Sequence, residues 1–209
     1  MIKSWGWVNN LSVKFGAFFS RLGLSPNFLT LMSLLFAIFG FFFIAFCNDI
    51  FLSLILFLIA GFLDMVDGAV ARATRKVSSL GAFLDGILDR YVEFIIYLGI
   101  FIYLWRNSGL DNFSLSLIFL FLVFGAIMTP FSIAYGIHRK AITEEKLKNL
   151  KSLFERAERL ISVYFAMILG LFETKLMLYV ICLVAFLSNL TALQRIAYVI
   201  HKNEKNSDL

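Results

Sequence analysis

Long hydrophobic segments separated by short polar breaks dominate the pattern of this 209-residue chain. The breaks leave six such segments, at residues 28–47, 50–71, 80–105, 113–137, 160–172 and 176–200. Most of them reach the roughly 20 residues that a helix needs to cross about 30 Å of hydrocarbon. The fifth is shorter, and would cross only if its helix begins further back, near Phe154. Because the alternating pattern of a membrane barrel is absent, the sequence predicts an all-α integral membrane protein with six transmembrane helices.

The chain begins with a weaker, amphipathic pattern. Hydrophobic residues recur at three- or four-residue spacing between positions 8 and 22, and the basic residues there lie off that stripe. This pattern predicts a helix at residues 1–24 that lies in the membrane interface, before a turn at Pro26 begins the first crossing. We therefore expect a single domain over residues 1–209, in which a six-helix bundle at 25–200 is followed by a solvated tail at 201–209.

Positive charge is divided unevenly between the two ends of the predicted helices. Of the 19 lysines and arginines, 17 fall on the side that holds both termini, and only Arg106 and Lys175 fall on the other. The positive-inside rule therefore predicts that both termini are cytoplasmic, in the cell membrane if the source is prokaryotic. The net charge of +5 gathers on that face, where it would attract anionic membrane lipids and phosphorylated substrates. Nucleic acid is a poor alternative, because the pattern contains no soluble basic domain.

Four aspartates interrupt the hydrophobic pattern around the turn between the second and third segments. Asp64 and Asp67 are three residues apart. Asp85 and Asp89 are four apart, so each pair shares one face of its helix. The two helices are consecutive and antiparallel, and we expect the four carboxylates to converge at the cytoplasmic end. Since like charges repel strongly in a low dielectric, the spacing predicts a divalent-cation site, and shared carboxylates suit two metal ions.

Two other interpretations of the aspartates remain open. One is a solvated helix end, which suits a single aspartate better than four in phase on facing helices. The other is a cation or proton transporter, because ion pathways also use acidic residues inside the membrane. The residues between the aspartates favour a phosphotransferase. Gly68, Ala71 and Gly81 are small where a ligand or a neighbouring helix must come close, and the planar fork of Arg72 suits a phosphate.

Together these residues form the pattern D-x2-D-G-x2-A-R-x8-G-x3-D-x3-D. It resembles the complete signature of the CDP-alcohol phosphotransferase family, whose members are six-helix membrane enzymes. The resemblance implies two divalent metal ions, Mg²⁺ or Mn²⁺, bound by Asp64, Asp67, Asp85 and Asp89. It implies that the CDP moiety is bound by Asp64, Gly68, Ala71, Arg72 and Gly81. It also implies that Asp89 is the general base that takes the proton of the acceptor hydroxyl, with CMP as the leaving group.

Flanking residues indicate which alcohol is accepted. Residues 80–91, with Arg90 after the last aspartate, and residues 153–161 are similar to segments of phosphatidylinositol phosphate synthases and their archaeal counterparts. A T-x2-Q-R motif in the last segment is similar to theirs as well. The resemblance implies that the phosphate of the acceptor is gripped by cationic side chains at the cytoplasmic face, namely Arg139, Arg156, Arg159 and Arg195. A simpler interpretation is that these arginines follow positive-inside topology and bind lipid headgroups.

We therefore expect an enzyme that moves a phosphatidyl-type group from a CDP-lipid to a phosphorylated polyol, inositol 1-phosphate, and releases CMP. Glycerol 3-phosphate as acceptor and CDP-inositol as donor remain alternatives. One departure supports keeping them: the inositol-phosphate enzymes commonly have a Lys before the position of Arg139, where this chain has Ile137 and His138. Homodimers are common in the family, and the resemblance implies one here.

Overall fold

The computed structural model describes residues 18–19, 23, 25–74, 78–147, 150 and 152–207. This part of the chain is all-α, with helices in the order α2 (Pro26–Phe46), α3 (Ile50–Ala73), α4 (Ser79–Asn107), α5 (Asn112–His138), α6 (Glu144–Leu147), α7 (Arg156–Gly170) and α8 (Thr174–Ser207). The interfacial helix expected at residues 1–24 falls almost entirely outside the described residues.

Capping side chains mark where most of these helices begin. Ser25 and Asp49 each accept a hydrogen bond from a backbone N–H of the first turn of α2 and α3, and Ser78 does the same for α4. In α7, Glu155 and Glu158 cap each other's backbone reciprocally. The helices therefore begin close to where the sequence predicts, because polar capping residues interrupt the hydrophobic pattern at those positions.

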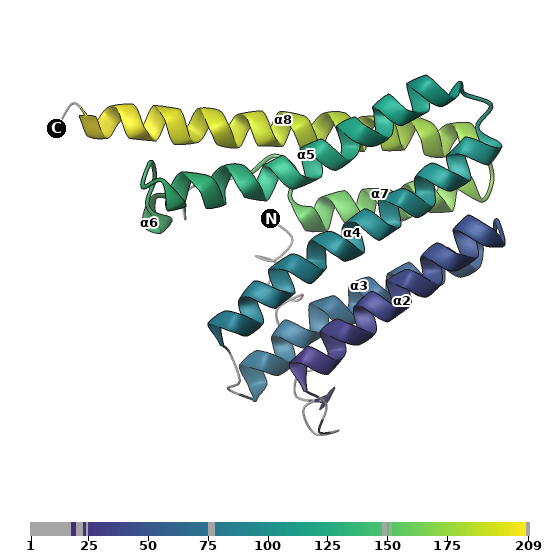
Figure 1. Cartoon of the computed structure of the whole chain (residues 1–209), viewed down its shortest axis with the longest axis horizontal. Helices are drawn as coiled ribbons and strands as arrows, with labels where there is room; N and C mark the ends of the chain where they lie inside the picture. Colours follow the sequence, from purple (N-terminus) through teal and green to yellow (C-terminus); the bar gives the residue numbers. More distant parts are fainter. Residues whose placement is uncertain are drawn as a thin grey trace.

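The helices run back and forth between two ends of the molecule (Figure 1). The turns that join α2 to α3, α4 to α5 and α7 to α8 gather at one end, and the connection from α3 to α4 lies toward the other. Helix α2 packs on α3 and α4, and α8 packs on α5 and α7. Contacts of α3 with α7 and of α4 with α5 join these two groups. The α3–α4 hairpin and the beginning of α7 are thereby brought together.

Small residues allow the helices to approach closely. A Cβ added at Gly40 would lie 2.6 Å from the buried ring of Phe57, and one added at Gly125 would lie 2.5 Å from Asn189 Nδ2. Asn189 in turn donates to the backbone oxygen of Phe121 on α5, at 2.7 Å. Such contacts are the usual source of helix association in lipid, where hydrophobic burial gives no net advantage.

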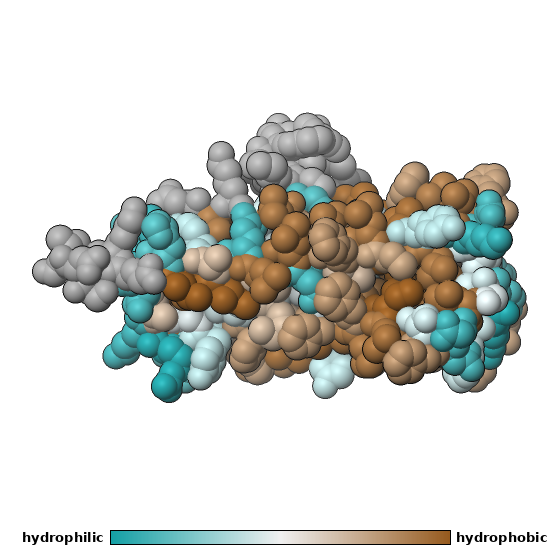
Figure 2. Space-filling view, turned by 90° about the horizontal axis from the view of Figure 1, so that it is seen from above, coloured by the Kyte–Doolittle hydropathy of each residue, from teal (hydrophilic) through white to brown (hydrophobic). Residues whose placement is uncertain are grey.

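The surface and the helix lengths identify a multi-pass membrane protein. Among the described residues, four helices are long and apolar enough to cross a bilayer: α2, α3, α5 and Thr174–Asn203 of α8. Helix α4 has 29 residues, but charged side chains occupy its first half. Helix α7 has 15 residues, or about 22 Å at 1.5 Å per residue. Hydrophobic surface forms a broad central band, with hydrophilic surface at both ends (Figure 2).

Candidate active site

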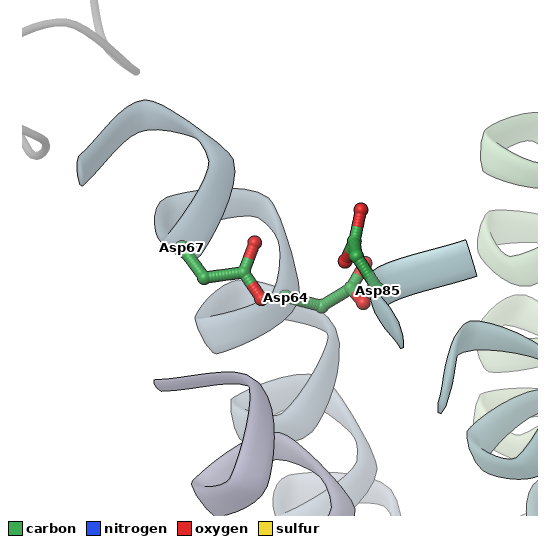
Figure 3. A group of neighbouring side chains, drawn as sticks. All are labelled: Asp64, Asp67 and Asp85. Carbon is green, nitrogen blue, oxygen red and sulfur yellow. The ribbon is translucent and has the colours of Figure 1, made fainter. Parts of the chain in front are cut away.

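Three of the four predicted aspartates form one cluster at the α3–α4 hairpin. Asp64 and Asp67 lie on α3 and Asp85 on α4, and each offers a carboxylate oxygen within 4.8 Å of the other two. Figure 3 shows the three side chains extending into a common space between the two helices. Asp67 is only 4% exposed. Asp64 and Asp85 are half-buried. Positive charge stabilises carboxylates this close together, and hard oxygen donors suit a divalent cation.

Asp89 joins this cluster through an arginine. Arg156 at the start of α7 places Nη1 3.0 Å from Asp64 Oδ2 and 2.8 Å from Asp89 Oδ2. Asp64 and Asp85 also lie close enough to Asp89 to act on it electrostatically. The Oδ1 atom of Asp89 is buried and has no hydrogen-bond partner among the described residues. The fourth carboxylate therefore lies beside the other three, with its Oδ2 atom paired to Arg156.

A cavity of about 280 Å³ adjoins the aspartates. It is lined by residues from the start of α2, the end of α3 and the start of α4, namely Pro26, Asn27, Thr30, Asp67, Gly68, Ala71, Arg72, Ser78, Gly81, Ala82 and Asp85. The small residues of the signature and its arginine therefore surround one hollow. Two of the clustered carboxylates also line it, so a ligand in the cavity would contact any cation that these carboxylates hold.

Gly68 and Gly81 line this cavity at positions that are not crowded by another helix. A Cβ added there would meet only the end of the Arg72 side chain, at 3.5 Å from Nη1. At Gly81 a Cβ would lie 3.0 Å from the capping hydroxyl of Ser78. Neither position is crowded by a neighbouring helix, in contrast to Gly40. Helix packing therefore does not require a glycine at position 68, which lines the cavity.

Thr30 is a site residue that the sequence analysis missed. Its hydroxyl on α2 donates a 2.6 Å hydrogen bond to Asp67 Oδ2, and the same hydroxyl lies 3.1 Å from the backbone oxygen of Pro26. Hydrogen bonds of this kind orient a carboxylate that binds a metal. The position of Thr30 one turn after a predicted helix start was the only signal, and it does not indicate a partner.

The four arginines expected to bind the acceptor lie in different surroundings. Arg156 bridges two aspartates, as described above. Arg159 is 1% exposed, and its Nε donates to Glu93 Oε1 at 2.6 Å. Arg195 donates to the hydroxyl of Ser152 and to the backbone oxygen of Thr129.

Arg139 is exposed at the C-terminal end of α5. Glu155 and Glu158, which flank Arg156 in the sequence, form the capping box of α7. The partner that the sequence did not indicate is Glu93, on α4.

Comparison with known proteins places this site in a family. Residues 23–196 match the family model described as CDP-alcohol phosphatidyltransferase. Archaetidylinositol phosphate synthase from Pyrococcus horikoshii is 32% identical over 183 residues, covering 88% of this chain and 87% of that protein. Phosphatidylinositol phosphate synthase from Streptomyces avermitilis is 33% identical over 147 residues, covering 70% of this chain and 57% of that protein.

Solved structures share the fold. Phosphatidylinositol phosphate synthase from Mycobacterium tuberculosis with CDP-DAG bound superposes with a TM-score of 0.75 and 21% identity, covering 91% of this chain and 94% of that one. The same enzyme in complex with manganese and citrate also has a TM-score of 0.75, at 20% identity over 90% of this chain and 88% of that one. The family predicted from the aspartate signature is confirmed: the chain belongs to the CDP-alcohol phosphatidyltransferase family and is a transferase.

Proposed function

We propose that the protein transfers a phosphatidyl-type group from a CDP-lipid to inositol 1-phosphate and releases CMP. The observation that carries the proposal is that Asp67 and Asp85 belong both to the carboxylate cluster and to the lining of the cavity. A diphosphate in the cavity would thus lie against the cation site. The archaeal and bacterial relatives named for inositol phosphate synthesis support the choice of acceptor. A transporter would use the acids but has no evident need of Arg72, which lines the same cavity.

The aspartates would hold two divalent cations, Mg²⁺ or Mn²⁺, shared among Asp64, Asp67, Asp85 and Asp89. When bound, such ions neutralise the diphosphate and stabilise the departing CMP. The CDP moiety would be held by Asp64, Gly68, Ala71, Arg72 and Gly81. The small residues leave room for the nucleotide, and the guanidinium of Arg72 offsets the charge of its phosphates.

Asp89 would act as the general base. The acceptor oxygen attacks the phosphorus nearer the lipid, its proton passes to the Asp89 carboxylate, and the bond to the CMP oxygen breaks. Arg156 holds Oδ2 of Asp89, and Oδ1 has no partner among the described residues, so Oδ1 is the atom we assign to the proton. A base held within reach of the nucleophile is what general-base catalysis requires.

We assign the acceptor phosphate to the basic side of the site, with Arg139, Arg156, Arg159 and Arg195 as its ligands. Arg195 is the member best prepared for this role. Its Nε and Nη2 both donate to the Ser152 hydroxyl, at 3.0 and 2.8 Å. A phosphate oxygen can replace this neutral partner with a stronger, charge-assisted bond.

We propose the following topology. Helices α2, α3, α4, α5, α7 and α8 cross the membrane as one domain over residues 1–209, and residues 1–24 lie at the interface. Both termini and the active site face the cytoplasm, and the enzyme forms a homodimer in the cell membrane. In support, the aspartates lie on the two helices that the α3–α4 connection joins. The positive-inside rule assigns 17 of the 19 basic residues of the sequence to the side of that connection.

The proposal is tested by the release of labelled CMP from a CDP-lipid by the purified protein. We expect release to require Mg²⁺ or Mn²⁺, to stop after treatment with a chelator, and to be fastest with inositol 1-phosphate among inositol 1-phosphate, glycerol 3-phosphate and serine. Faster release with glycerol 3-phosphate would contradict the acceptor. Transfer to inositol 1-phosphate from CDP-inositol, but not from a CDP-lipid, would contradict the donor.

A further inference from the structure

Two successive ion pairs join α4 to α7. Asp89 pairs with Arg156, and one turn further into the bundle Glu93 pairs with Arg159, at 2.6 Å. The spacing of four residues on α4 and three on α7 places both pairs along the same line of contact. The Asp89–Arg156 side chains are partly exposed, whereas both side chains of the inner pair are only 2% exposed.

In the inner pair, the hydrogen bonds converge on one carboxylate oxygen of Glu93. Glu93 Oε1 accepts from Arg159 Nε and also from the Tyr97 hydroxyl, at 2.7 Å. Arg159 Nη1 and Glu93 Oε2 are buried without a hydrogen-bond partner in the described part of the chain. Buried charged groups rarely leave such atoms unpaired, because their desolvation then goes uncompensated. A buried guanidinium with an unpaired N–H is suited to an oxyanion.

Guanidinium groups from three helices lie within electrostatic range of one another. Arg159 of α7 and Arg90 of α4 both lie near enough to Arg195 of α8 to act on it electrostatically, as does Glu155. Arg90 Nη1 is also buried without a hydrogen-bond partner among the described residues, and its distance to Asp89 Oδ2 is 3.6 Å. Cations gathered in a low dielectric favour an anion among them.

We propose that Glu93, held by Tyr97, is a positioning residue that orients Arg159 for the acceptor phosphate, in a site shared with Arg90 and Arg195. The inference rests on the proposed function, since that function supplies a phosphorylated acceptor. By engaging Nε, Glu93 sets the rotation of the guanidinium plane and leaves the other N–H groups for the ligand. Glu93 also gives Arg159 a carboxylate other than the aspartates, which stay available for cations.

The test is the Glu93→Gln variant of the full-length enzyme in the CMP-release assay. The amide keeps the size of the side chain and an oxygen that can accept from Arg159, but it removes the charge. We expect the KM for inositol 1-phosphate to rise about tenfold to a hundredfold, as for loss of a charged hydrogen bond. The kcat and the KM for the CDP-lipid should stay within about threefold, because those depend on the aspartate side.

Matched variants separate positioning from folding. Tyr97→Phe should raise the same KM by a smaller factor. Ser188→Ala, which removes a buried hydroxyl that donates to the backbone oxygen of Val184 on the same helix, should change none of the constants. In an Arg159→Gln background, adding Glu93→Gln should leave the acceptor KM as it is, because Glu93 acts through Arg159.

Several outcomes would overturn the inference. A lower Tm with an unchanged acceptor KM in both Glu93→Gln and Tyr97→Phe would show that the pair is only structural, and so would equal losses with both substrates. If the wild type prefers glycerol 3-phosphate, the proposed acceptor fails, and the rise in KM must then be seen for glycerol 3-phosphate. If only unphosphorylated alcohols are accepted, the proposed function and this inference fail together.

Discussion

The acidic and the basic sides of the site are built in different ways. The aspartates come from one helical hairpin, α3 and α4, and three of their carboxylates lie within 4.8 Å of one another. The arginines come from α4, α5, α7 and α8, and the buried one among them is held by a carboxylate of another helix. A cation site can therefore arise from the spacing of one hairpin, whereas an anion site inside a bundle needs a second set of residues to hold each long cationic side chain.

The largest effect is expected on the acidic side, from Asp89→Asn. The amide has the same shape but cannot take up the proton of the acceptor hydroxyl. We expect kcat to fall about a hundredfold to ten-thousandfold, while binding of the CDP-lipid stays near the wild-type value. CMP release and direct lipid binding measure the two quantities. Near-normal turnover would show that the base lies elsewhere.

Arg156→Gln removes the residue that links the two sides. Asp64 and Asp89 would then face each other without the guanidinium between them. Without added metal, we expect the free energy of unfolding to fall by about 1–3 kcal/mol, and Mn²⁺ should raise the Tm of the variant more than that of the wild type. Arg106→Gln serves as a control, because Arg106 donates to the backbone oxygen of Ala45 at the opposite end. Equal metal-induced shifts in wild type and Arg156→Gln would contradict the bridge.

Gly68→Ala and Gly40→Ala compare the cavity with the packed interior. At Gly68 the methyl group would enter the cavity, so we expect unchanged or slightly higher stability, with binding of the CDP-lipid weakened by about 1 kcal/mol or more. At Gly40 the methyl group would press on Phe57, and we expect a loss of about 1–3 kcal/mol in the free energy of unfolding. Denaturation measures the stability of the two variants, and lipid-binding measurements give their affinity for the CDP-lipid. A destabilised Gly68→Ala enzyme would place that glycine in the packing instead.

The most local effect, confined to metal binding, is expected from Thr30→Val. The side chain keeps its shape but loses the hydroxyl that donates to Asp67. We expect Mn²⁺ affinity to fall about tenfold, at the low end for residues that orient metal ligands. Thr30→Ser, which retains the hydroxyl, should bind Mn²⁺ as the wild type does. If both variants bind the metal equally well, the hydrogen bond does not orient Asp67.

The separation of residues along the chain decides how much of the fold and of the candidate site could be predicted from the sequence. Asp64 to Asp89 lie in two adjoining helices, so helical spacing alone brought their carboxylates together. The hydrophobic pattern likewise located α2, α3, α5 and α8. By contrast, Arg159 and Glu93 are 66 residues apart, and Thr30 and Asp67 are 37 apart. No local periodicity connects such pairs, and a glutamate inside an apolar run gives no sign of which helix will face it.

The shortness of α7 affects how two substrates of opposite solubility meet. A helix of 15 residues covers about 22 Å of a hydrocarbon layer of about 30 Å. In the proposed topology, the C-terminal end of α7 lies at the outer surface of the membrane. Its first residue, Arg156, then lies inside the hydrocarbon layer, short of the cytoplasmic lipid headgroups. In that topology a water-soluble acceptor would descend to this depth, while the lipid donor would arrive from the side with its acyl chains still among other lipids. The depth of one helix end would thus let the hydrophobic substrate react without leaving the bilayer.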